Sequence, residues 1–295
     1  MRVALPLESV PNFSEGRDEA TIAALAEALG EARLLDVHSD VDHNRSVFTL
    51  VGDDEVLVDA LLAGVACARD RIDLRRHEGA HPRVGAADVV PLVPVTPEDM
   101  PRAQRAAGLL AERIGGELAI PVFLYGGKDR GPAFFRRGGP EELQRRIDAG
   151  ELEPDFGPAE LDPRAGGVVL GARRPLIAFN VDLRGGTLDD ARAIASVVRE
   201  RDGGFPGVRA LGLDLPAAGR VQVSMNVEDW EAAALHEIVA RIEAEAASRG
   251  VEVAGCELVG LMPAGAAAAA AGALLRIDGF DATRLLELRL LDESR

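Results

Sequence analysis

The chain reads SVFTLVGDDEVLVDALLAGV at Ser46–Val65 and VQVSMNVEDWEAAALHEIVA at Val221–Ala240. Each stretch begins with alternating apolar and polar residues, the pattern of a half-buried strand. Each then continues directly into an acidic helix start. Because the same pattern occurs once in each half, the sequence predicts two structural repeats.

The segments that flank the first copy predict the order βαββαβ, followed by a further helix and strand. Glycines 115 and 116 are expected to end that further helix. Strands are expected at Arg2–Ser9, Ala32–His38, Ser46–Val51, Val89–Val93 and Leu118–Leu124, and helices at Asp18–Leu29, Asp53–Arg71 and Pro97–Ile114.

The second half repeats the order. Thr187 and Asp190 come close to a capping box at the start of its first helix. Strands are expected at Pro175–Leu183, Val208–Asp214, Arg220–Asn226 and Val251–Val259, and helices at Thr187–Arg201 and Glu228–Arg249. We therefore expect an α+β protein of two tandem ferredoxin-like (βαββαβ) subdomains, residues 1–173 and 174–295, with helices packed on mostly antiparallel sheets.

Two segments fall outside this repeat. Residues 130–171 are rich in Gly, Pro and charge, and we expect a long loop with one short helix at Pro140–Ala149. A loop of this length is usually functional or disordered. The alanine run Ala266–Ala271 is expected to be helical by propensity.

Composition excludes several classes of function. The chain has 33 basic and 49 acidic residues, a net charge of −16, which argues against a nucleic-acid binder or a protein of anionic membrane surfaces. Small anionic ligands remain possible wherever positive side chains gather. No apolar run has the length of a membrane span and the N-terminus lacks a signal-peptide pattern, so we expect a cytoplasmic protein. The two cysteines lie far apart without metal-ligand spacing.

Reactive side chains are densest at His77–Asp88, HEGAHPRVGAAD. Pro82 biases His81 toward extended backbone, so the imidazole is expected to project from a stiffened loop. A neutral histidine can accept a proton near pH 7, and Arg83 beside it favours the neutral form and can bind an anion. A surface loop whose histidines hydrogen-bond locally is the alternative.

Arginines also gather around this loop, and their planar guanidinium groups suit carboxylates. The members are Arg69, Arg71, Arg75, Arg76 and Arg83. A solvated helix end accounts for Arg69 and Arg71 about as well, but it explains Arg83 less well.

A second polar cluster, Asp36–Arg45, lies in the turn between two strands. Its spacing matches no metal signature, and a polar turn that faces the substrate is favoured over a metal site. The chain has no serine-hydrolase, Walker or dinucleotide-binding motif.

Segments along nearly the whole chain resemble the formiminotransferase family. They are Val10–Gly16, Leu34–Val37, Asn44–Val47, His81–Ala86, Pro121–Gly126, Pro154–Pro158, Gly171–Arg173, Leu176–Asn180 and Leu258–Leu261. The resemblance implies two ferredoxin-like halves, a homodimer and no metal requirement. It also implies transfer of the formimino group from N-formimino-L-glutamate to tetrahydrofolate, the co-substrate, in histidine breakdown and one-carbon metabolism.

The resemblance places the catalytic histidine at His81, as general base and acid. Substrate-binding residues are then expected at Asn12, His38, Asn44, Arg45 and Arg83. The folate-contacting stretch falls on Gly157, Pro158, Ala159, Glu160, Leu161, Asp162, Pro163, Arg164, Ala165 and Gly166.

Two departures from the family pattern leave alternatives open. His38 stands where the bifunctional members have an aspartate, and residues 162–166 lack an aromatic that could stack on folate. A related transferase with a different one-carbon donor or acceptor is one alternative. A non-catalytic small-ligand-binding module is another, because fold does not dictate function.

Overall fold

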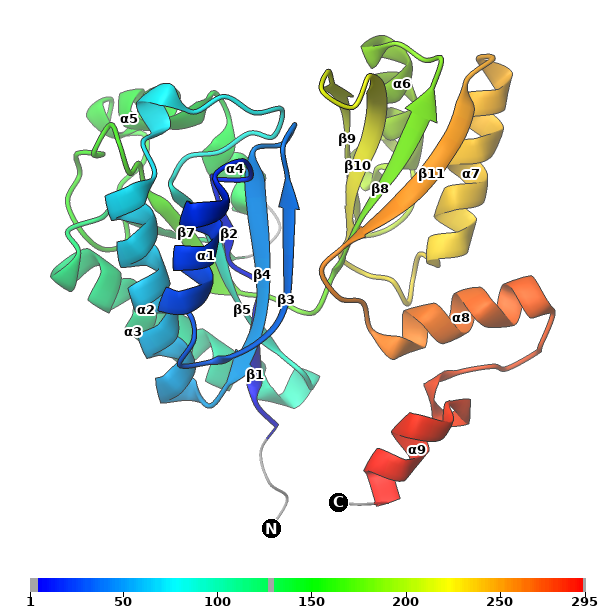
Figure 1. The fold of residues 1–295 in the computed structure, drawn as a ribbon, viewed down its shortest axis with the longest axis horizontal. Helices are drawn as coiled ribbons and strands as arrows, with labels where there is room; N and C mark the ends of the chain where they lie inside the picture. Colours follow the sequence, from blue (N-terminus) through cyan, green and yellow to red (C-terminus); the bar gives the residue numbers. More distant parts are fainter. Residues whose placement is uncertain (1–4, 127–129, 294–295) are drawn as a thin grey trace. The chain divides into compact units, whose positions relative to one another are not determined.

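Two units, residues 1–174 and 175–295, make up the chain (Figure 1). The structure, a computed structural model, describes residues 5–126 and 130–293. The expected α+β class is confirmed, because each unit packs helices against a sheet of its own.

The sheet of the first unit reproduces the predicted repeat. The first strand of the repeat is interrupted at Val10 and Pro11, which divide it into β1 and β2. Both parts pair with β4 on one side and with β5 on the other, and β3 pairs with the free edge of β4. The strand order is therefore β3-β4-(β1, β2)-β5. The elements are β1 (Leu7–Ser9), β2 (Asn12–Phe13), α1 (Glu19–Ala28), β3 (Arg33–Asp40), β4 (Arg45–Gly52), α2 (Asp54–Arg71) and β5 (Ala87–Pro94). The strand expected from Arg2 is observed only at Leu7–Ser9, and residues 2–4 lie outside the described part.

Side chains along β4 alternate between the core and the opposite face of the sheet. Phe48 and Leu50 are fully buried beneath α1 and α2, and Phe48 meets the ring of Phe13 edge-on at 5.4 Å. Because strand side chains alternate, Arg45 and Val47 project from the other face. This opposite face carries the residues described in the next section.

The segment 130–171 is not a long loop, and that prediction is wrong. It holds α4 (Pro132–Arg136), the expected short helix as α5 (Gly139–Asp148), and the start of β7 (Val168–Ala172). Strand β7 is parallel to both β5 and β6 (Val122–Leu124), and α3 (Met100–Glu117) packs against β5 and β7. The apolar run of β7 was missed because glycine and charge dominate the residues before it.

The second unit has the strand order β11-β8-β10-β9, all antiparallel, as expected for βαββαβ. Its elements are β8 (Ile177–Arg184), α6 (Leu188–Val198), β9 (Val208–Leu215), β10 (Arg220–Val227), α7 (Leu235–Ser248) and β11 (Glu252–Val259). The capping box of Thr187 and Asp190 is confirmed.

Helix α7 begins later than predicted, at Leu235 instead of Glu228. The carboxylate of Asp229 accepts from the Ala232 amide, and Glu228 N–H donates to the carbonyl of Gly207. These bonds hold the acidic residues in a turn before the helix. The copies in the two halves therefore match in their strands but differ in the join to the helix.

Beyond the repeat, the alanine run forms α8 (Ala264–Leu275), as predicted, and α9 (Leu286–Glu293) follows. Short 3-10 helices lie at η1 (Leu74–Arg76), η2 (Pro97–Asp99), η3 (Glu200–Asp202) and η4 (Ala282–Arg284). Among the described residues, no helix combines the length and the apolar composition needed to cross a membrane.

Candidate active site

The two polar clusters singled out in the sequence meet in the first unit. The amide of Asn44, in the β3–β4 turn, donates to the carbonyl of Glu78 (2.9 Å), and Ala80 N–H donates to the carbonyl of Asp42 (3.0 Å). A Cβ at Gly79 would lie 2.3 Å from the carbonyl oxygen of His43, so only glycine fits this approach. The turn therefore fixes the loop that carries His81.

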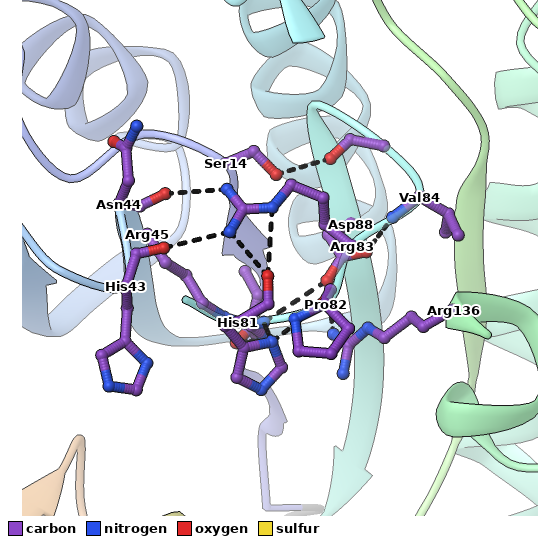
Figure 2. Close-up of polar contacts among 12 residues, drawn as sticks. Ser14, His43, Asn44, Arg45, His81, Pro82, Arg83, Val84, Asp88 and Arg136 are labelled. Atoms are coloured by element: carbon purple, nitrogen blue, oxygen red, sulfur yellow. Dashed lines mark hydrogen bonds and ion pairs between the residues drawn. The ribbon is translucent and has the colours of Figure 1, made fainter. Parts of the chain in front are cut away.

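Arg45 and His81 form the centre of the site (Figure 2). Nη1 of Arg45 lies 2.7 Å from Nδ1 of His81. Nε and Nη2 of Arg45 both donate to Oδ1 of Asn12, at 3.0 and 2.5 Å. Asn12 therefore holds the guanidinium in position against the imidazole.

Asp88 is the buried carboxylate of the site, with 2% of its surface exposed. Its Oδ1 accepts from Val84 N–H at 2.9 Å, and its Oδ2 accepts from Arg136 and lies 3.4 Å from Nη1 of Arg45. Asp88 thus connects the His81 loop, strand β4 and helix α4.

Arg83 braces the loop from the other side. Its guanidinium donates to the carbonyl of His81 (2.6 Å) and to that of His43 (3.1 Å), and it contacts the ring of His77. His77 in turn lies 2.9 Å from the carbonyl of Asn44. Arg83 therefore holds the loop through its backbone carbonyls and His77, and does not bind the ring of His81.

The environment disfavours positive charge on His81. Burial, together with the guanidinium groups of Arg45 and Arg136, holds the pKa of the half-buried imidazole well below its usual range. Burial also lowers the pKa of Arg45 to about 9 and that of Arg83 to about 10. The lowered pKa of His81 thus comes from burial and from Arg45 and Arg136, whereas burial and Arg83 lower the pKa of His77.

Four predicted substrate residues lie in this cluster: Asn12, Asn44, Arg45 and Arg83. His38 lies on β3 opposite Val47, and its neighbour Asp40 lies opposite Arg45, so His38 shares the sheet face of Arg45 and Asn12.

The predicted group of arginines separates. Arg69 pairs with Asp70, and Arg75 pairs with Asp73, both on the surface. Only Arg83 of that group reaches the site. The arginines around His81 instead come from β4, the loop and α4.

The predicted folate stretch runs beside the His81 loop at its C-terminal end. Ala86 N–H donates to the carbonyl of Ala165 (2.8 Å), and Gly167 N–H donates to that of Val84 (3.0 Å). Gly166, with φ of +67°, pairs with Gly85. Gly157–Glu160 and Asp162–Arg164 are exposed, whereas Leu161 and Ala165 are buried.

A shallow pocket of about 430 Å³ opens beside His81. His81 shares its lining with the rest of the loop and with the start of α5: Leu74, His77, Glu78, Gly79, Pro82, Arg83, Gly139 and Pro140. Within the described ranges, no three His, Cys, Asp or Glu side chains gather as metal ligands would.

Asp88, Arg136 and His43 were given no role from the sequence. Asp88 carried a signal, since a carboxylate at the start of the buried strand ADVVPLVP needs a buried partner. Arg136 carried none, because it stands among several arginines in the mid-chain segment.

The site places a half-buried histidine beside arginine side chains that can bind an anion. Profiles of known families identify the class of protein. The formiminotransferase domain, N-terminal subdomain, matches residues 6–173, and the formiminotransferase domain matches residues 178–280. The chain belongs to the formiminotransferase family, as its sequence resemblance predicted.

Curated relatives span nearly the whole chain. A glutamate formimidoyltransferase of Streptococcus pyogenes serotype M1 is 39% identical over 294 residues, covering 97% of this chain and 98% of its own length. One of Thermoplasma acidophilum is 38% identical over 294 residues, covering 96% and 97%. The formimidoyltransferase-cyclodeaminase of Rattus norvegicus is 38% identical over 271 residues, or 87% of this chain and 50% of the relative. These relatives are transferases, which favours an enzyme over a non-catalytic binding module.

Proposed function

We propose that this protein transfers the formimino group of N-formimino-L-glutamate to tetrahydrofolate, with His81 as the proton carrier. The observation that carries the proposal is a half-buried histidine of lowered pKa within a surplus of positive charge. The names of the full-length relatives support the donor. Tetrahydrofolate, a place in histidine degradation and the role of His81 rest on the family resemblance.

The charge balance of the site suits an acidic substrate. Arg45 contacts the ring of His81, Arg83 holds its backbone, and Arg136 pairs with Asp88, the buried carboxylate of the site. Nε of Arg136 is buried and has no hydrogen-bond partner among the described residues. Buried cations need anionic partners, and a glutamate-type donor carries carboxylates that could supply them.

The reaction requires one group that first accepts and then donates a proton. A pterin nitrogen of tetrahydrofolate forms a bond to the formimino carbon and loses its proton to Nε2 of His81. The bond between that carbon and the glutamate nitrogen then breaks, and the leaving nitrogen takes the proton from Nε2. A histidine of lowered pKa is neutral at neutral pH, as the first step requires of its base.

The stretch Gly157–Gly166 is our candidate for the folate contact. Its buried end pairs with the His81 loop, so a ligand held by its exposed residues would lie beside the catalytic ring. Exchanging residues 158–160 for serines is expected to raise KM for tetrahydrofolate and to leave KM for the donor unchanged.

His81→Asn tests the main proposal in a coupled assay with both substrates. We expect turnover to fall by about 10²–10⁴-fold, the usual contribution of histidine acid–base catalysis. Calorimetry with folinate, and circular dichroism, should match the unsubstituted protein. Full turnover in a folded His81→Asn protein would refute the assigned base.

A related transferase with a different one-carbon donor or acceptor is the second candidate, because His38 shares the sheet face of Arg45. Calorimetry decides: absence of binding by both tetrahydrofolate and folinate favours this alternative.

The resemblance also leads us to propose a cytoplasmic homodimer. Sedimentation velocity, with an expected mass of twice that of the chain, tests the assembly.

A further inference from the structure

One ring nitrogen of His81 has two neighbours with opposite requirements. Nδ1 lies 2.7 Å from Nη1 of Arg45 and 2.8 Å from the carbonyl oxygen of Pro82. A guanidinium can only donate, so it requires a lone pair on Nδ1, whereas a carbonyl can only accept, so it requires a proton there. The two contacts are therefore hydrogen bonds in different protonation states of the ring.

The choice between these neighbours decides whether Nε2 can act as a base. When Arg45 donates to Nδ1, the neutral ring carries its proton on Nε2, which then has no lone pair to offer. When Pro82 accepts from Nδ1, the lone pair is on Nε2. Among the described residues, nothing hydrogen-bonds Nε2, and the ring lines the pocket.

Arg45 can change partner with a small movement. Its Nε and Nη2 are anchored on Asn12, and only Nη1 contacts the histidine. Nη1 also lies 3.4 Å from Oδ2 of Asp88, so a second acceptor is already close. A small tilt of the planar guanidinium toward Asp88, with Nε and Nη2 still within hydrogen-bond distance of Asn12, would free Nδ1.

The groups that face His81 keep its ring neutral, so the hydrogen bonds select the tautomer. Arg45 comes from β4, Arg136 from α4, and His43 from the β3–β4 turn, with its ring centroid 6.1 Å from that of His81. Asp88 is the carboxylate paired with both arginines. With cations on several sides, the resting ring does not gain a second proton.

We propose that Arg45 is a positioning residue that holds His81 in its non-basic tautomer until an anionic substrate draws Nη1 away. The inference rests on the proposed function, which supplies that anion as a carboxylate of the amino-acid donor. The carboxylate accepts the N–H of Nη1, and Nδ1 is released. Through water, the proton leaves Nε2 and another arrives on Nδ1, where the carbonyl of Pro82 accepts it. The ring stays neutral, no covalent bond between heavy atoms changes, and Nε2 becomes the base.

Nitrogen NMR of ¹⁵N-histidine-labelled protein reads the tautomer directly. The chain has 5 histidines, and the signals that vanish in His81→Asn belong to His81. In the free protein we expect the Nε2–H tautomer. Saturating L-glutamate should raise the ratio of Nδ1–H to Nε2–H by about tenfold or more, because the charge-assisted hydrogen bond from Arg45 to Nδ1 is exchanged for one to the carboxylate. Absence of glutamate binding by calorimetry, or binding with an unchanged tautomer, overturns the proposal.

Variants of Arg45 test the tautomer independently of substrate binding. Arg45→Met removes the donor, so its free form should already show Nδ1–H, and Arg45→Lys should restore Nε2–H. Arg113→Met is the matched control, because the ion pairs of Arg113 within the described part of the chain, with Asp59 and Glu117, lie on the surface. Identical tautomers in folded Arg45→Met and unsubstituted protein refute the role of Arg45.

Turnover is measured separately in the same samples. A tautomer switch without formimino transfer would refute the proposed reaction and leave the switch standing. Transfer at the normal rate without a switch would refute only the switch.

Discussion

The two units share one strand order, but they differ in the connection between the second helix and the last strand of the repeat. In the first unit, residues 72–86 connect α2 to β5 and carry His77, His81 and Arg83. In the second unit, residues 249–251 make the equivalent connection from α7 to β11. The repeated scaffold is therefore common to both units, and the candidate chemistry lies in a loop that only one of them has enlarged.

The sheet faces differ in the same sense. The first unit places Arg45 and Asn12 on the face opposite its helices, next to the enlarged loop. On the second sheet, the amide of Gln222 donates to Asp182 (3.0 Å), and Arg220 pairs with the same carboxylate. A buried carboxylate thus occurs in both units, but only that of the first unit joins separate elements around a histidine.

The largest expected effect is the difference in stability lost when Asp88 of the first unit and Asp182 of the second are each replaced by asparagine. Asp88→Asn leaves Arg45 and Arg136 without a buried counter-charge, and we expect a loss of about 3–5 kcal/mol in the free energy of unfolding. Asp182→Asn should cost about 1 kcal/mol, because its partner Arg220 has a 44% exposed side chain. Urea unfolding measures both, and equal losses would contradict the distinction.

Glycines in the two connections should differ in their effect on turnover. Gly79→Ala forces the loop away from the carbonyl of His43, and we expect a loss of about 10²-fold in turnover from a displaced His81. Gly250→Ala meets open space among the described residues, but its φ is +71°, so it should cost about 1 kcal/mol of stability with normal turnover. Steady-state kinetics and thermal unfolding separate the two effects, and normal turnover in Gly79→Ala would contradict the role of the loop.

The pH dependence should report the charges that only the first unit gathers. Burial and positive neighbours lower the pKa of His81, so turnover should persist into mildly acidic solution and fall only when the ring is protonated. Arg136→Met removes one positive neighbour, which raises that pKa and moves the acidic fall to higher pH. Rate profiles from pH 4 to 9 test the sign, and an unmoved or lower midpoint would count against it.

The smallest expected effect is a change in melting temperature on replacing Glu8, a carboxylate in the first sheet. Burial raises the pKa of Glu8, in β1, and Arg173 opposes the rise. A raised folded-state pKa means that stability present at low pH is lost as pH rises through that value. Glu8→Gln should therefore raise the melting temperature by about 2 °C at pH 7 and not at pH 4. A decrease at pH 7 would show that the Arg173 pair dominates.

The sequence was most informative where periodicity determines structure. The strands and helices of both repeats follow from alternation and helix ends, and His81 stands out because of the proline that follows it. The mid-chain segment was misjudged because β7 pairs with β5 and β6, partners that no local pattern reveals. Likewise, Arg45 lies far from His81 in sequence, and no local pattern reveals the contact between the β3–β4 turn, where Asn44 has a φ of +45°, and the loop.

Arg45 belongs to a paired strand, and this has a consequence for folding. Its side chain reaches the histidine only in one register of β4 against its neighbours, because a slip by one residue would turn it toward the hydrophobic side. A misaligned sheet would thus be inactive even when compact. Recovery of activity during refolding should therefore report correct strand alignment. We expect it to be slower than the return of the helical circular dichroism signal and independent of it.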